Sequence, residues 1–416
     1  MPKPFRRAVI AAASMVLLAT GLAGIAAGGA GASTAGSSPG VTATTVKVGI
    51  ISDLTGAAAS TFEDAAPAME ARFKQVNAAG GVNGRKIVWS VADTTSTPAG
   101  AETAAKSLVQ SKGVFLVSAE SALTFGGSTY LQQAGVPVIG SSVDGPEWYE
   151  QPNTNMFNIT GNDSPSEPGY TDGGFWKKIG ATKVSFIASN TPSSTRGVNP
   201  FEADMKLDGL SVCDNTIVPL GGVNFTTYAL SFKTAGCNGV ECSCVLSSSL
   251  AMATALKQDG LTNVKISACC ASQDVYASPE DLAAANGVYF STYVPPNAAG
   301  NTLLAGLKKY DSAYKGGVPD LGAADGWEVA NLTVEALQVA GKNPTRSSLI
   351  TNLRNVTSWT DNGLAASPVD FKTFGQAPAT TCTFDVQFVN KKFVPFPKSG
   401  KPFCGRLIPG SGTPPS

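Results

Sequence analysis

The chain has 416 residues, 43% of them hydrophobic and 14% charged, which is typical of a globular protein with a sizeable core and more than one domain. Thirty Lys and Arg balance thirty Asp and Glu, which excludes a global field that would attract nucleic acid or an acidic membrane surface. The sequence contains no histidine, which excludes His-based nucleophile pairs and every His-ligated metal site.

The first 32 residues have the pattern of an export signal. Positively charged residues within the first seven precede an apolar run at about 8–27, and Ala30–Ala32 fits a small-residue cleavage site. We therefore expect residues 1–32 to be a signal peptide and the protein to be extracellular, periplasmic or held at the cell surface. An uncleaved membrane anchor is the alternative. The first cysteine is Cys213, so we expect no lipoprotein cysteine.

A strand–loop–helix–strand unit opens the folded part of the chain, after a flexible Gly/Ser/Thr-rich lead-in at 33–45. A dense apolar run at 46–51 is typical of a strand buried on both faces of a parallel sheet. Apolar residues at near-helical spacing predict a helix at about 62–79, and a second strand is expected at 87–92. The polar loop 52–62 follows the carboxyl end of the first strand, where open α/β sheets bind their ligands.

Strand and helix patterns continue to alternate along the chain, which predicts an α/β protein with two doubly wound parallel sheets. Further strands are expected at 114–117, 136–139, 183–188, 210–219, 242–247, 264–270 and 288–293. Helices are expected at about 98–111, 127–134, 167–179, 200–208, 226–234, 250–259, 280–285, 302–314, 323–340 and 346–355. The glycine-rich motifs of dinucleotide sites and phosphate loops and the nucleophile elbow do not occur, so these enzyme classes are unsupported.

The opening segment also resembles a known family. VGIISDLTG at 48–56 and VNAAGGVNGRKI at 76–87, followed by a polar segment containing Asp93, resemble the solute-binding proteins of branched-chain amino-acid and amide uptake systems. These leucine-binding-protein-like receptors have the type I periplasmic-binding-protein fold, and the resemblance runs from about Val46 to about Gly341. It implies two doubly wound lobes joined by a three-segment hinge, with the ligand between them.

The resemblance also implies domain boundaries. The expected lobes are 46–160 plus 294–368 and 161–293 plus 369–416. The expected crossings between them lie near 158–162, 293–296 and 367–372. Short crossings of this kind absorb the backbone changes of hinge closure.

The loop at 118–124, after the third strand of the first lobe, is the first candidate for ligand contacts. In relatives the equivalent loop supplies a hydroxyl and backbone N–H groups to a ligand carboxylate, and by position Ser121 and Ala122 match these groups. A helix begins after the loop, and its free N–H groups and dipole favour an anion independently of the resemblance. The alternative is that Ser121 is only the N-cap of that helix.

The next loop, 140–149, matches the family's second ligand-contacting position. Relatives that bind amino acids have small residues and a Thr here, whereas this chain has Ser142 and, at the Thr-like position, Asp144. A carboxylate there repels a ligand carboxylate or pairs with a ligand ammonium group. Alternatively, Asp144 forms an Asx-turn before Gly145.

Other cleft positions follow only from the resemblance. Phe62 lies where relatives place an aromatic ring over the ligand, and Trp327 occupies the place of a Tyr, with core packing as its alternative. Gln273 is a candidate for an amine or hydroxyl contact from the second lobe. Arg196 and Arg85 are the cationic residues nearest these loops, and we interpret each as a solvated surface charge.

Eight cysteines in an exported chain favour disulfides. Cys382 and Cys404 are isolated from the others, so we expect them to pair and to staple the C-terminal segment. The pairing of the other six stays open: Cys213, Cys237, Cys242, Cys244, Cys269 and Cys270. The last four could instead form a four-thiolate metal site, although their spacing is not that of a zinc ribbon.

Together these features predict a non-enzymatic solute-binding protein that captures a small polar ligand, such as an amino acid or amide, for an ABC importer. We expect a monomer with a small-molecule ligand and a membrane permease as partners, and no nucleic acid, metal or cofactor. An extracellular sensor of the same fold is one alternative. A secreted hydrolase using carboxylates such as Asp53 and Asp144 is another, and opposed carboxylates with one raised pKa would favour it.

Overall fold

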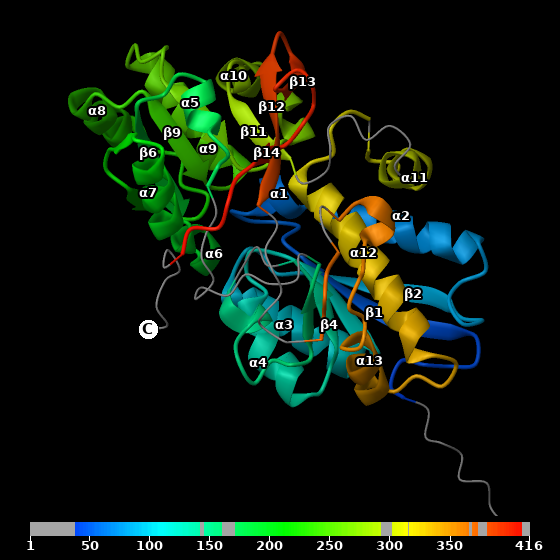
Figure 1. Ribbon diagram of the computed structural model, residues 1–416. Helices are drawn as coiled ribbons and strands as arrows, with labels where there is room; N and C mark the ends of the chain where they lie inside the picture. Colours follow the sequence, from blue (N-terminus) through cyan, green and yellow to red (C-terminus); the bar gives the residue numbers. More distant parts are fainter. Residues whose placement is uncertain are drawn as a thin grey trace, which may run out of the picture. The chain divides into compact units, whose positions relative to one another are not determined.

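The computed structural model describes residues 38–141, 145–159, 171–292, 302–314, 316–365, 368–372 and 381–409 (Figure 1). All of these belong to one compact unit of the chain. The expected signal peptide at 1–32 and two expected ligand residues, Ser142 and Asp144, lie outside the described residues. Within the described ranges, no helix is long and apolar enough to cross a membrane.

The first sheet is parallel throughout, and its described strands follow the order β2-β1-β3-β4-β5. They are β1 (Thr45–Ser52), β2 (Lys86–Asp93), β3 (Leu116–Glu120), β4 (Val138–Gly140) and β5 (Met156–Asn158). Residues 48–52 of β1 are all buried, as expected for an apolar run in a sheet that is covered on both faces. Because the strands are parallel, their carboxyl ends gather at one edge of the sheet.

Helices from two distant parts of the chain accompany this sheet. Before β6 these are α1 (Ala59–Phe62), α2 (Ala65–Ala78), α3 (Pro98–Lys106), η1 (Ser107–Ser111), α4 (Phe125–Gln133) and η2 (Pro146–Trp148), whereas α5 (Phe175–Lys178) packs in the core of the second sheet. Those after β11 are α11 (Thr302–Tyr310), α12 (Leu321–Ala340), α13 (Arg346–Leu353) and η4 (Asp361–Gly363). Val329 and Leu349 of this later group pack with Ile50 and Phe73 in one apolar core.

Helix α12 is buried along almost its whole length and contacts α2, α13 and β3. Figure 1 shows α12, in gold, running beside α2. Gly326 permits this close approach, since a Cβ atom there would lie 2.5 Å from the carbonyl oxygen of Ala65. The hydroxyls of Ser118 and Thr333 form a buried hydrogen bond of 2.7 Å that joins β3 to α12. The helix is therefore an integral layer of the first lobe.

The second sheet is mixed, with the described order β13-β12-β11-β10-β9-β6-β7, β8 beside β6, and β14 beside β12. Its strands are β6 (Lys183–Ser189), β7 (Ser211–Val212), β8 (Thr216–Val218), β9 (Gly239–Ser243), β10 (Lys265–Ala268), β11 (Tyr289–Thr292), β12 (Cys382–Val389), β13 (Lys392–Phe396) and β14 (Phe403–Cys404). Its further helices are α6 (Pro192–Arg196), α7 (Val198–Leu207), α8 (Thr226–Ala235), α9 (Leu246–Gln258), η3 (Gln273–Tyr276) and α10 (Pro279–Ala285). Strands β6 to β11 pair in parallel, whereas β12 pairs antiparallel with β11, β13 and β14 (Figure 1).

Three expected elements of the second lobe are wrong in their extent. The strand expected at 242–247 is β9 at Gly239–Ser243, and Leu246 already begins α9. The strand expected at 210–219 is divided into β7 and β8, and a disulfide from Cys213 to Cys237 holds the chain between them. The helix expected at 167–179 begins only at Phe175 within the described residues. The Asp172 carboxylate accepts hydrogen bonds from the N–H groups of Gly174, Phe175 and Trp176, which sets that start.

The chain connects the two sheets three times: between β5 and β6, between β11 and α11, and after Phe371 before β12. Val369 and Phe371 still pack in the core of the first sheet, whereas Val386 and Phe388 pack in the core of the second. The predicted fold class, two doubly wound α/β lobes joined by three segments, is confirmed. The antiparallel strands β12 to β14 are an addition that the sequence analysis did not predict.

Replacing Gly326 by alanine is expected to lower the stability of the protein by about 1–3 kcal/mol, the usual range for overpacking. The added methyl group meets backbone atoms of Ala65, which cannot rotate away as a side chain can. Urea unfolding of Gly326→Ala measures the effect. Gln338→Ala, at an exposed position of the same helix, is the control for the change in helix propensity. A Gly326→Ala variant as stable as the parent would contradict the close packing of α12.

Candidate functional site

A cavity of about 230 Å³ is lined by residues of both lobes, and we call it the hydroxyl cavity. Its hydroxyl groups come from Thr61, Ser141, Ser189, Thr191, Ser193, Ser194 and Ser243. Its apolar lining residues are Phe62, Ala122, Leu220, Val245 and Leu321. The backbone N–H of Leu246 donates to the Thr61 hydroxyl oxygen at 3.2 Å, so the two lobes are in direct contact beside the cavity.

The Asp53 carboxylate occupies the donors that were expected to bind a ligand. Asp53 is fully buried at the end of β1 and accepts hydrogen bonds from the Ser121 hydroxyl at 2.7 Å and the Ala122 N–H at 2.9 Å. The Thr94 hydroxyl donates to the same carboxylate. Burial raises the pKa of Asp53, while these donors oppose the rise. The anion bound by this loop is thus supplied by the protein itself.

Asp93 fixes the loop that follows β1. Its carboxylate accepts hydrogen bonds from the backbone N–H groups of Leu54 at 3.0 Å and Thr55 at 3.3 Å, and from the Thr55 hydroxyl at 2.6 Å. The Ser96 hydroxyl donates to the Thr55 carbonyl at 2.7 Å, which ties the same loop to the end of β2. Loop 52–62 is therefore held at the sheet edge, and Phe62 with it.

The other expected ligand residues occupy different surroundings. Phe62 and Ala122 line the hydroxyl cavity, whereas Ser121 faces Asp53 and lines neither cavity described here. Trp327 is fully buried, and its ring packs against Gly306 in the space that a Cβ atom of residue 306 would need. These surroundings are those of a core residue, the alternative given for Trp327 in the sequence analysis. The Gln273 amide donates to the Val318 carbonyl at 2.8 Å. As ligand contacts these residues remain predictions.

Arg196 lines the hydroxyl cavity, where the sequence analysis expected only a surface charge. Its guanidinium group lies over the Tyr149 ring, 5.9 Å from the ring centre, which is the geometry of a cation–π interaction. Arg85, the other cation considered, donates to the Thr42 carbonyl at 2.6 Å and lines neither cavity. The position of Arg196 at the end of α6 after β6 was the available sequence signal.

A second and larger cavity, of about 390 Å³, adjoins the first, and we call it the acidic cavity. Six carboxylate residues line it: Asp172, Asp204, Glu241, Asp325, Glu328 and Asp385. No Lys or Arg occurs among the described residues of this lining. Ser243, Cys269 and Asp325 line both cavities, so the two form a continuous region between the lobes. Sequence reasoning missed these acids, because they come from separate elements with no common motif.

Burial dominates the electrostatics of the acidic cavity. It raises the pKa of Glu241 and of Asp325 to about 8, and the pKa of Asp204 and of Asp385 to about 7. Burial also raises the pKa of Glu328, and the neighbouring carboxylates Asp361 and Asp325 add to this effect. Near neutral pH several of these groups therefore carry protons, which lowers the cost of burying them together.

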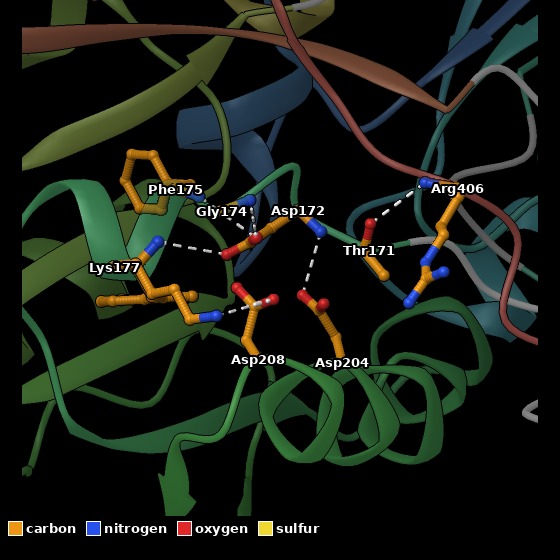
Figure 2. A network of polar contacts seen from close by, with 9 residues as sticks. Thr171, Asp172, Gly174, Phe175, Lys177, Asp204, Asp208 and Arg406 are labelled. Carbon is orange, nitrogen blue, oxygen red and sulfur yellow. Dashed lines mark hydrogen bonds and ion pairs between the residues drawn. The ribbon is translucent and has the colours of Figure 1, made fainter.

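Two of the lining acids, Asp172 and Asp204, lie close to Asp208, as Figure 2 shows. One oxygen from each lies within 4.8 Å of the others, a set of hard ligands that suits a divalent cation such as Ca²⁺. All three already have partners. Asp172 accepts the N–H groups that begin α5, and Asp208 pairs with Lys177 at 3.3 Å. Asp204 accepts the Asp172 N–H at 2.9 Å through one of its two oxygens.

The cysteines form three pairs in the structure: Cys213–Cys237, Cys269–Cys270 and the expected Cys382–Cys404. The last pair joins β12 to β14, so it staples the C-terminal strands. Cys242 and Cys244 are unpaired and buried, and burial raises the pKa of the Cys244 thiol to about 12. These cysteines do not form the four-thiolate metal site considered above, because Cys269 and Cys270 are bonded to each other.

The chain matches a family model described as periplasmic binding protein over residues 45–392. Among curated proteins it is similar to the Leu/Ile/Val-binding protein homolog 3 of Brucella melitensis, with 24% identity over 192 residues. That match covers 46% of this chain and 52% of the relative, so the two align over about half of the relative's length.

Solved structures share the fold at low sequence identity. A fatty acid ABC transporter substrate-binding protein from Thermomonospora curvata has a TM-score of 0.71 and 20% identity, covering 86% of this chain and 93% of that one. The branched-chain amino acid transporter substrate binding protein LivJ from Streptococcus pneumoniae, in complex with isoleucine, has a TM-score of 0.69 and 17% identity, covering 88% and 99%. A solute binding protein of an ABC transporter from R. palustris, in complex with benzoate, has a TM-score of 0.71 and 15% identity, covering 88% and 98%. At these identities the likeness concerns the fold alone.

Replacing Asp53 by asparagine is expected to destabilise the protein by about 1–3 kcal/mol, the cost of leaving buried polar groups unsatisfied. The asparagine amide presents a donor to groups that are themselves donors, namely the Ser121 hydroxyl, the Thr94 hydroxyl and the Ala122 N–H. Thermal unfolding checks this, with Asp214→Asn, at an exposed position, as the control. Equal stability of Asp53→Asn and the parent would contradict the role of Asp53 as the internal anion.

The unfolding free energy of the ligand-free protein is expected to fall as the pH rises from about 4 to about 8. The acidic-cavity groups have folded pKa values of about 7 to 8, above those of the unfolded chain. Their contribution is therefore complete below the unfolded pKa and is lost as the pH rises through the folded pKa.

Urea unfolding at several pH values measures this slope. Asp325→Asn removes one such group and should flatten the slope by up to about 1.4 kcal/mol per pH unit. Glu102→Gln, an exposed residue that pairs with Lys106, is the matched control and should leave the slope unchanged. Stability that increases across this pH range would show that the acidic cavity does not bind protons as described.

Proposed function

This chain belongs to the periplasmic binding protein family, and on that premise we propose that it is an extracytoplasmic solute-binding protein that delivers a small polar ligand to an ABC importer. The observation that carries the proposal is the hydroxyl cavity, which residues of both lobes enclose beside their direct contact at Thr61 and Leu246. Ligands in open α/β folds bind outside the carboxyl ends of strands, and Ser189 and Ser243 end β6 and β9 at this cavity.

The lining suits a ligand of amino-acid or amide size. Hydroxyl groups and the Arg196 guanidinium provide donors for an anionic or carbonyl group, while Phe62 and Leu220 offer apolar surface. The isoleucine, fatty acid and benzoate named with the structural relatives each contain a carboxyl group, which supports an anionic contact at Arg196. Binding across both lobes favours the closed arrangement, which a membrane permease distinguishes from the open one.

The carboxylate pattern supports binding more than hydrolysis. A glycosidase of the usual kind needs one protonated carboxyl group and one ionised partner. In the acidic cavity burial raises the pKa of Asp204, Glu241, Asp325 and Asp385 alike. These four groups therefore do not divide into a protonated acid and an ionised partner. Asp53 is engaged by three donors, and its expected partner Asp144 lies outside the described residues.

Thermal unfolding against a panel of amino acids, amides, amines, short-chain acids and sugars tests the function. A ligand at one hundred times its Kd is expected to stabilise the protein by about 2.7 kcal/mol. Arg196→Gln should reduce the shift produced by a ligand with an anionic group, whereas Arg85→Gln, away from both cavities, should not. A complete panel without any shift would count against a solute-binding role.

A further inference from the structure

We propose that the acidic cavity holds the ammonium group of the bound solute, so that the ligand class is an organic cation with an amine-bearing chain. This inference rests on the proposed function, because it assigns the chemical class of the solute captured between the lobes. It goes further by giving the larger cavity a role separate from that of the hydroxyl cavity.

The distribution of charge around the cavity is the first argument. Asp325 and Glu328 belong to α12 in the first lobe, whereas Glu241 of β9 and Asp385 of β12 belong to the second sheet. Asp172 and Asp204 are the other two carboxylate residues of the lining. Carboxylates thus meet from both lobes, and the described lining contributes no cationic side chain to compensate them. A cation between the lobes would be attracted by both sides and would hold them together.

Two basic groups that interact with acids of this region, Lys177 and Arg72, are already engaged elsewhere. Lys177 pairs with Asp208, and its side chain is about half exposed (51%). Arg72 donates to the Gln75 amide oxygen at 2.7 Å and lies 5.7 Å from the centre of the Trp327 ring. Burying several acids without a cationic partner is costly, and the protein meets this cost by retaining protons on them. An ammonium group could replace those protons.

The remaining lining favours an organic cation over a metal ion. Phe175, Phe186 and Phe201 also line the cavity, and aromatic rings attract ammonium groups through their faces. Metal ions of the Ca²⁺ or Mg²⁺ type instead require a compact cage of oxygen ligands. The volume of about 390 Å³ lies within the usual range for small-molecule sites, well above the space that one ion needs. At the Asp172 end, Figure 2 shows acids already bonded to backbone N–H groups and Lys177.

The connection between the cavities defines the shape of the ligand. Asp325, Ser243 and Cys269 line both, so a chain-like solute can place a polar or anionic head in the hydroxyl cavity near Arg196. Its ammonium group then extends among Asp325, Glu328 and Glu241. A basic amino acid or a diamine has this arrangement of groups.

Isothermal titration calorimetry of the full chain with matched compounds tests the inference. Lysine is compared with norleucine, and cadaverine with 1,5-pentanediol, at pH 8 and at pH 6. The cationic member of at least one pair is expected to bind at least tenfold more tightly than its neutral-chain counterpart. Its affinity should also be greater at pH 8, because the facing groups Asp204, Glu241, Asp325 and Asp385 lose protons as the pH rises. The other titratable groups that face this region are Asp172, Glu328, Asp361 and Lys177.

Two neutralising variants probe the cavity from opposite lobes. Glu328→Gln on α12 and Asp385→Asn on β12 should each weaken binding of the cationic compound by tenfold or more, while stabilising the ligand-free protein at pH 8. A purely structural role for these acids would not give opposite signs for binding and stability. Glu335→Gln, on α12 but outside the lining, is the matched control and should change neither.

The outcomes separate this inference from the proposed function. Equal binding within both pairs, or unchanged affinity in both variants, overturns the inference and leaves a solute-binding role intact. Binding of a neutral or anionic solute from the wider panel, without any binding of these cations, likewise overturns the inference and supports the solute-binding role. Calcium chloride alone is titrated as well, and tight binding that is lost in both variants would make the cavity a metal site instead. If no solute of any class binds, both proposals fail.

Discussion

The burial of α12 is the constraint on which the rest of the structure depends. This helix packs against α2 through Gly326 and against β3 through the bond between Thr333 and Ser118, so it belongs to the core of the first lobe. A helix buried all round is usually apolar, yet α12 carries Asp325 and Glu328. With Leu321 these residues follow the i, i+4, i+7 spacing of one helix face, and all three line the region between the lobes. The packing of one face of the helix thus fixes the position of two acids on another.

At the carboxyl ends of the first sheet's strands, the loop after β3 keeps the donor groups expected from the family resemblance but binds a different partner with them. The loop after β3 presents the expected hydroxyl and N–H donors, but the Asp53 carboxylate takes them from within the protein. Donors of that kind are strongest when desolvated, so a buried internal anion is a stable partner for them. In the function proposed above, recognition of the solute is left to the hydroxyls near Arg196 and to the acids beyond Asp325. These hydroxyl residues and acids come mainly from the second lobe and from α12.

Much of the fold could be predicted from the sequence, because buried parallel strands such as β1 are local apolar runs with polar loops at their ends. Short antiparallel strands such as β14 carry no comparable signal, and the start of α5 depends on the Asp172 cap. Of the site, Phe62 and Ala122 could be placed at the cavity by family position. The acidic cavity could not, since its residues are spread from Asp172 to Asp385 and each resembles an ordinary surface acid until folding brings them together. The partner of Ser121 was equally hidden, because Asp53 lies 68 residues away in the chain.

The proton-retaining acids of the larger cavity also relate solute capture to the surroundings of the cell. If the proposed cationic solute binds in this cavity, it displaces protons from Glu241, Asp325 and their neighbours, and loading of the protein then releases acid into the medium. By the same linkage, protons act as competitors of the solute, and an acidified exterior favours the empty receptor. Uptake through such a protein would decline as the medium becomes acidic, without any dedicated pH sensor and in a chain that has no histidine.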